Sequence, residues 1–279
     1  MESTLAPVFG AVLPVFGLVG CGYLAGRLKI VTQASSHALN QFVYAFALPA
    51  MLFIAVYRGS LEEILSGAFL LAVILATLGT ALIGFSLSYY VAGASPAEST
   101  MRALNASFAN TGYLGIPLVT VAYGERAALP AALATVATNI ISFALAVLLV
   151  FLETKIPLPV ERFSTLLAAA AGPCALFAIG LFVSQLSIRA GVQSSWQTTL
   201  LKLVVHPLLM ALLAFYVLPV DAFWAKIAVV CAALPLGATA FVLAQRYRLL
   251  EAETSTGAVV STAASLLTVS LVMALLTGR

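Results

Sequence analysis

Long apolar runs alternate with short polar connections along the whole chain. The runs are about as long as the ~20 residues that one helix needs to cross a bilayer, and charged residues or proline, glycine and serine bound them. Lipid offers no hydrogen-bond partner to non-helical backbone, so each run predicts a transmembrane helix. The predicted spans are residues 5–26, 36–57, 66–91, 101–122, 127–151, 163–185, 196–218, 223–245 and 256–276.

The composition supports this interpretation. Of the 279 residues, 62% are hydrophobic and 8% are charged, whereas about 25% are charged in a soluble domain. The N-terminal run has no basic residues before it and no clear cleavage site, so we expect it to be the first span and not a signal peptide. The net charge of +3 is spread over short loops, which gives no basic face for nucleic acid. The chain is therefore predicted to be an all-α polytopic membrane protein.

Two apolar runs contain proline and glycine in their middle, in the segments NTGYLGIP (110–117) and AALPLGATAF (232–241). Broken helices at membrane depth are tolerated only where protein buries them or where they line a polar cavity. We therefore predict a substrate site there, with ordinary kinks as the alternative, because both residues are common in membrane helices. The candidate substrate-binding residues are Asn110, Thr111, Gly112, Tyr113, Gly115, Pro117, Leu234, Pro235, Gly237 and Thr239, with Asn139 from the fifth span.

The chemistry of these segments favours an anion. Asn110 offers two donors and one acceptor, which suit a carboxylate or the cap of the following half-helix, or else a hydrogen bond between helices. Pro235 and Gly237 repeat the backbone chemistry without an amide, so polarity there has to come from Thr239, Gln245 or the backbone. Two half-helix N-termini aimed at one point would each favour negative charge. Asn139 either faces the cavity or bridges helices.

The two halves of the chain resemble each other. FALPAMLF (46–53) is similar to AAGPCALF (170–177), and the same offset places Asn110 beside Pro235. Such symmetry is typical of transporters. We expect a first repeat at residues 1–152 and a second at 163–279.

With this offset, the partner of the first span falls on the fifth span, so a sixth span is missing at the connector 153–162. Either a segment is absent from this sequence or the chain is a nine-span variant. The distribution of basic residues over the loops mildly favours an absent span, with the N-terminus on the outer side of the cell membrane.

Three segments carry a family resemblance. They are ALNQFVYAFALPAMLF, NASFANTGYLGIPLVTVAYG and AALPLGATAFVLAQRYR, and they resemble the second, fourth and ninth spans of the auxin efflux carrier family. This family comprises bacterial relatives of the plant PIN auxin carriers and belongs to the bile acid/sodium symporter-like superfamily. The resemblance covers nearly the whole chain.

The resemblance implies inverted five-helix repeats with two crossed, interrupted helices. Scaffold helices would be residues 5–57 and 163–185, and transport helices residues 66–151 and 196–276. It also implies transport of a small organic anion, often a carboxylate, by an elevator mechanism in a homodimer. No cofactor or metal is expected, and the bacterial inner membrane is the expected location.

Ionisable groups inside the predicted spans are few. Lys202 and His206 lie four residues apart on one helix face and could couple protons or anions, but we expect Lys202 to snorkel to the interface. No catalytic set or metal-ligand spacing is visible in the spans, which argues against an enzyme. The chain is thus predicted to be a secondary carrier or uniporter, with an ion channel or a non-transporting receptor as the alternatives.

Overall fold

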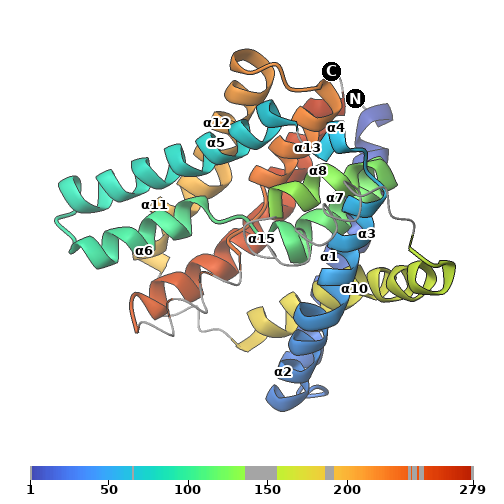
Figure 1. The fold of residues 1–279 in the computed structure, drawn as a ribbon. Coiled ribbons are helices and arrows are strands. Elements are labelled where there is room, and N and C mark those ends of the chain that lie inside the picture. The colour runs from blue at the N-terminus through green and yellow to red at the C-terminus, as the bar shows by residue number, and fades with distance from the viewer. Residues whose placement is uncertain are drawn as a thin grey trace. The chain divides into compact units, whose positions relative to one another are not determined.

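A computed structural model describes residues 2–64, 66–135, 156–185, 192–237, 240, 244 and 248–277, and nearly all of these residues are helical (Figure 1). Five helices are long and apolar enough to cross a membrane, which agrees with an all-α membrane protein. They are Ala38–Tyr57, Glu62–Val91, Leu158–Gln185, Ser195–Val217 and Glu251–Leu276. The remaining predicted spans coincide with shorter apolar helices or run into residues outside the described ranges, so the number of nine spans stays a prediction.

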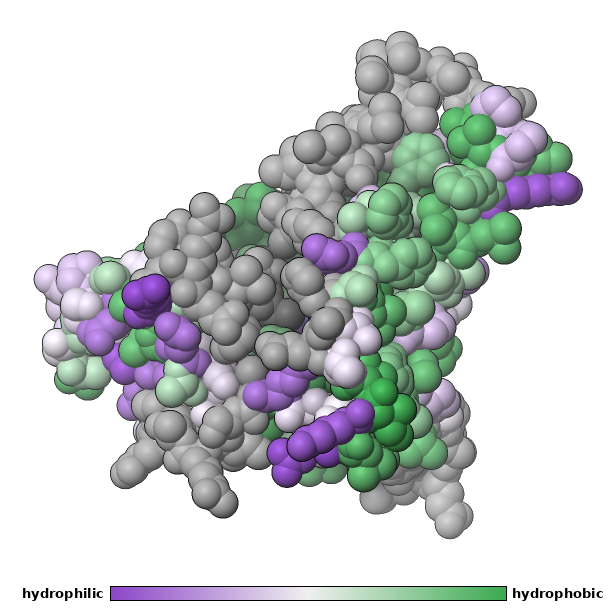
Figure 2. Space-filling view, turned by 90° about the horizontal axis from the view of Figure 1, so that it is seen from below, coloured by the Kyte–Doolittle hydropathy of each residue, from purple (hydrophilic) through white to green (hydrophobic). Residues whose placement is uncertain are grey.

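Many large apolar side chains are exposed, as lipid contact requires of a membrane protein. On α5 (Gly67–Ser86), for example, Leu71, Ile74, Leu78 and Leu82 are exposed while Phe69 is buried. Hydrophobic residues likewise cover much of the coloured surface in Figure 2. The helices therefore show an apolar exterior where a soluble protein would be polar.

The chain divides into two compact units. The first unit comprises Met1–Phe9, Ala68–Asn110 and Leu186–Arg279, and the second unit comprises Gly10–Gly67 and Thr111–Gln185. The second unit thus combines the predicted scaffold spans with residues from 111 onward, which the sequence assigns to the transport helices.

The second unit is built around α10. Its helices are α1 (Glu2–Arg27, from residue 10), α2 (Gln33–Phe42), α3 (Leu48–Tyr57), α4 (Leu61–Ile64), α7 (Ile116–Tyr123), α8 (Ala128–Thr135) and α10 (Leu158–Gln185). A Cβ on Gly22 of α1 would run into the backbone of Phe177, and one on Gly180 of α10 into the backbone of Val19. Small residues at this crossing let two membrane helices approach backbone to backbone.

Helix α10 begins within the predicted connector at 153–162. The helix begins at Leu158, so residues 158–162 form its first turns, while residues 153–155 lie outside the described ranges. Pro159 suits the first turn of a helix, because backbone amides there have no acceptor within the helix and proline has none to satisfy. The negative charge of Glu161 interacts favourably with the positive end of the helix dipole.

Three prolines inside helices each follow a π-helical segment. The segments η1 (Val43–Ala47), η3 (Thr111–Gly115) and η6 (Leu201–Val205) end two residues before Pro49, Pro117 and Pro207. A proline cannot donate to the preceding turn and its ring clashes with the carbonyl four residues back, and a widened turn relieves both problems. These prolines therefore bend helices without ending them.

The first unit contains the remaining elements, α5, η2 (Leu87–Val91), α6 (Pro96–Ser107), α11 (Val192–Leu200), η6, α12 (His206–Leu212), η7 (Leu213–Val217), α13 (Ala222–Ala232) and α15 (Glu251–Thr277). Ser95 and Glu98 form a capping box at the start of α6. The hydrogen bond from the Ser95 backbone amide holds the pKa of Glu98 below its ordinary value. In this unit α11 packs against α6 and α15, and α12 packs against α13.

Candidate functional site

The first helix interruption lies at residues 108–110. Helix α6 ends at Ser107, and Phe108 adopts an extended conformation with φ −83° and ψ 101°. Helical structure resumes at Thr111 and continues to Tyr123. The sequence placed the interruption at 110–117. The structure agrees with this placement at Asn110 but not at residues 111–117, because η3 accommodates Pro117 within a continuing helix.

The second helix interruption lies at residues 233–237, where the sequence predicted it. Helix α13 ends at Ala232, and the amide of Ala233 still bonds to the carbonyls of Val229 and Val230. Pro235 follows, and it cannot continue the ladder of helical hydrogen bonds because it has no amide hydrogen. The chain beyond Ala233 is therefore free to pair elsewhere.

The two interruptions pair with each other. Ala109 and Leu236 form an isolated antiparallel β-bridge. The amide of Asn110 donates to the carbonyl of Pro235 at 2.9 Å, and the amide of Gly237 donates to the carbonyl of Phe108 at 2.9 Å. Backbone groups that have no partner within their own helix thus find one in the other interruption. Such pairing is needed where lipid offers no hydrogen-bond partner.

Gly237 permits this close approach. A Cβ at this position would lie 3.1 Å from Cδ1 of Phe108 and 3.3 Å from the carbonyl oxygen of Ala109. Both distances are tighter than ordinary carbon contacts. The pairing of the two segments therefore requires a small residue at position 237.

Neighbouring helices add polar support to the second interruption. The amide of Leu236 donates to Oγ of Ser261 on α15 at 3.1 Å. Nζ of Lys202, in η6, donates to the carbonyl of Ala232 at 2.6 Å. Side chains distant in sequence thus provide the polarity that this interruption lacks in its own residues.

Four predicted site residues are brought together in the first unit. Asn110, Leu234, Pro235 and Gly237 are all buried, and Asn110 is 7% exposed. The hydrogen bond between Asn110 and Pro235 joins the two segments directly. Asn110 therefore stands, buried, at the junction of the interruptions.

The other predicted residues belong to the second unit or fall outside the described residues. Thr111, Gly112, Tyr113 and Gly115 belong to η3, and Pro117 to α7, in the second unit. A Cβ on Gly112 would meet Thr135 and Leu48, and one on Gly172 of α10 would lie 3.5 Å from Cβ of Pro117, so this helix is closely packed. Thr239 and Asn139 lie outside the described residues.

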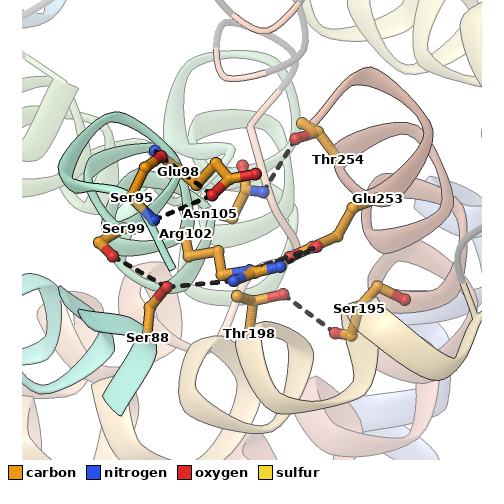
Figure 3. A network of polar contacts seen from close by, with 10 residues as sticks. All are labelled: Ser88, Ser95, Glu98, Ser99, Arg102, Asn105, Ser195, Thr198, Glu253 and Thr254. Carbon is orange, nitrogen blue, oxygen red and sulfur yellow. Dashed lines mark hydrogen bonds and ion pairs between the residues drawn. The ribbon is translucent and has the colours of Figure 1, made fainter. Parts of the chain in front are cut away.

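An ion pair between the partly buried Arg102 and the buried Glu253 escaped the sequence analysis. Nε and Nη2 of Arg102 each donate to the Glu253 carboxylate at 3.0 Å, a two-pronged contact, and Glu253 is 5% exposed. Nη1 of Arg102 donates to Ser88, which also accepts from Ser99 (Figure 3). Nδ2 of Asn105 donates to Oγ1 of Thr254 at 2.9 Å. This network joins η2, α6 and α15.

Lys202 also departs from the sequence prediction. The predicted snorkelling is wrong, because Lys202 is completely buried and His206 is 3% exposed. Nζ of Lys202 lies 3.1 Å from Nδ1 of His206 as well as bonding to Ala232. Its charge is therefore directed at the end of α13 and not at the membrane surface.

Comparison with known proteins identifies the family. A family model described as "Membrane transport protein" matches residues 7–138 and 131–273. The chain belongs to this family, which is the auxin efflux carrier family that the motifs around Asn110 and Pro235 indicate.

Several curated proteins are similar to the chain. It is 30% identical to the "Putative malonate transporter" of Rhizobium meliloti, with 95% of each chain aligned. It is 24% identical to the "Uncharacterized transporter YfdV" of Escherichia coli K12, over 85% of this chain and 88% of that one. A stretch covering 44% of this chain is 33% identical to 14% of the mouse "Lysosomal cholesterol signaling protein".

The Rhizobium alignment also bears on the length of the chain. It extends over 303 positions, 24 more than the 279 residues present here. At least this many positions of the relative therefore have no counterpart, which exceeds the ~20 residues of one transmembrane helix. The two matches to the family model meet at residues 131–138.

Proposed function

We propose that this member of the membrane transport protein family is a secondary carrier or uniporter for a small organic anion, specifically a carboxylate. The observation that carries the proposal is the paired interruption, with the buried Asn110 amide at its junction. Non-helical backbone at membrane depth is a common way to build a solute site in transporters. The name of the Rhizobium meliloti relative supports a dicarboxylate such as malonate as the first compound to test.

Uptake of labelled malonate into proteoliposomes tests this function directly. We expect saturable uptake that unlabelled malonate blocks and uncharged malonamide does not, because the site is proposed to select negative charge. Flux that never saturates would favour a channel. Binding without flux would favour a receptor, an alternative kept because the mouse relative is named a signaling protein.

The Asn110→Ala variant tests the site. Loss of a donor to a buried charged ligand should weaken malonate binding by about 1–3 kcal/mol. Gln197→Ala removes an exposed amide of α11 in the same unit and serves as the matched control. Equal binding by Asn110→Ala and wild type would contradict the assignment of Asn110 to the site.

We further propose that the fold is the inverted-repeat fold of ten spans with one span lost. The extra alignment positions of the relative and the junction of the family matches support a loss between residues 131 and 157. Elevator motion of one unit, a homodimer and a cell-membrane location with the N-terminus outside belong to the same proposal. Labelling of single cysteines at both chain ends checks it, because an odd number of spans places the ends on opposite faces.

A further inference from the structure

The Lys202–His206 pair is a buried pair of basic side chains beside the second interruption. Nζ of Lys202 donates to the carbonyl of Ala232, the last residue of α13, at 2.6 Å. Pro235 follows only three residues later, so Nζ of Lys202 lies next to the first residues of the interruption. It also faces the negative end of the α13 dipole, which favours a cation.

Within the part of the chain that the structure describes, no acidic side chain pairs with Lys202. Among the described residues, the ion pairs are Arg102–Glu253 and Arg58–Glu161, and neither includes Lys202. The elements that pack against η6 and α12 include α5, α6, α11, α13, α15 and η7. The titratable side chains that the structure describes on them are Glu98, Arg102, Tyr216, Lys226, Cys231, Glu251 and Glu253.

The carboxylate of Glu253 is already committed to Arg102. A buried charge without a counter-ion is costly, and such a group usually becomes neutral or acquires a partner. The charge of Lys202 is therefore expected to depend on whether an anion is nearby.

His206 supplies a second, independent observation. Its Nε2 atom is buried and has no hydrogen-bond partner among the described residues. When Lys202 is charged, its ammonium group can only donate, so Nδ1 of His206 then accepts from it and the ring proton sits on Nε2. An unpaired buried donor is unfavourable, and the oxygen of an anion or of an ordered water would satisfy it.

We propose that Lys202, with His206, is the proton-coupling site of the carrier. When an organic anion occupies the interruption, the neutral amine of Lys202 takes up one proton from the side on which the anion enters. The proton is released when the anion leaves on the other side, so that anion and proton move together. This inference rests on the proposed function.

The coupling follows from reciprocity. If the anion favours the charged form of Lys202, the charged form must favour the anion by the same factor. Malonate binding should therefore tighten as the pH falls through the range in which Lys202 of the empty carrier becomes charged. A lysine that is already charged takes up nothing, so proton uptake on malonate binding should decrease as the pH is lowered.

Calorimetry of malonate binding in buffers of different ionisation enthalpy tests the proposal, because it counts the protons taken up. For the wild-type protein in nanodiscs we expect about one proton per malonate at pH 8. Lys202→Gln retains a donor for Ala232 but no charge, and it should lose proton uptake and at least about tenfold in affinity. Lys226→Gln, on the neighbouring helix α13, is the matched control and should behave as wild type.

The outcomes are distinct. Malonate binding by wild type without proton uptake overturns the proton coupling and leaves the carrier proposal intact. Proton uptake that persists in Lys202→Gln assigns the proton elsewhere and also overturns the inference. A failure of wild type to bind malonate contradicts the proposed malonate site itself, and this inference with it. The proton count of wild type decides the matter even if Lys202→Gln does not fold.

Discussion

The interruption at 108–110 and the interruption at 233–237 bond to each other but obtain their polarity from different sources. The first has its own side-chain amide, Asn110, and contains no proline. The second has Pro235 and Gly237, and its polar partners come from Ser261 on α15 and Lys202 in η6. Two halves related by sequence symmetry can thus share a backbone geometry while differing in chemistry. Experiments on each interruption should therefore have different outcomes.

The largest effect should come from the ion pair that connects α6, the helix leading to the first interruption, with α15, the helix that supports the second interruption. Arg102→Ala leaves Glu253 buried without a counter-ion, which should destabilise the protein by about 3–5 kcal/mol. Denaturant unfolding in detergent measures the loss. The control is Arg58→Ala, which removes an exposed pair of 3.6 Å in the second unit and should cost less than about 1 kcal/mol. Similar losses in both variants would show that the Arg102 pair is not structural.

The contact between the interruptions is tested next. In Gly237→Ala the new Cβ presses on Phe108 and Ala109, which should cost about 1–3 kcal/mol and reduce malonate uptake. Gly257→Ala is the matched control, because a Cβ there would lie 3.6 Å from Ser195 in ordinary contact. Within helix α15 that change should stabilise the protein by about 0.5–1 kcal/mol. Opposite signs are expected, and equal signs would refute the close approach.

The support from α15 should have a smaller effect. Ser261→Ala removes the acceptor for the amide of Leu236 and should cost about 1 kcal/mol, with faster hydrogen exchange at that amide. Ser265→Ala is also buried but loses only a bond to its own helix carbonyl, at Thr262. If Leu236 exchanges no faster in Ser261→Ala than in Ser265→Ala, the second interruption does not depend on α15.

The sequence predicted the second interruption because Pro235 and Gly237 disfavour a helix at their own positions. The first interruption was misplaced because Pro117 gives the same signal, although η3 accommodates this proline within a helix. Phe108 and Ala109 carry no proline or glycine that would have predicted their non-helical conformation. Contacts between distant residues were missed. Arg102 and Glu253 are separated by 151 positions, and Lys202 is buried by its contact with Ala232, which no periodicity within its own helix reveals.

The smallest expected effect compares the two prolines. In Pro235→Ala the carbonyl that accepts from Asn110 remains, and only the restraint on φ is lost, so the protein should lose about 0.4–1 kcal/mol of stability. Malonate uptake should fall, because the segment after Ala232 becomes able to extend α13 instead of pairing with residues 108–110. Pro117→Ala restores an amide within a continuous helix, so stability should be equal or higher and uptake close to wild type. Thermal unfolding and proteoliposome uptake of both variants measure this difference. A larger loss of uptake in Pro117→Ala would mean that the bend at η3, and not the paired interruption, controls transport.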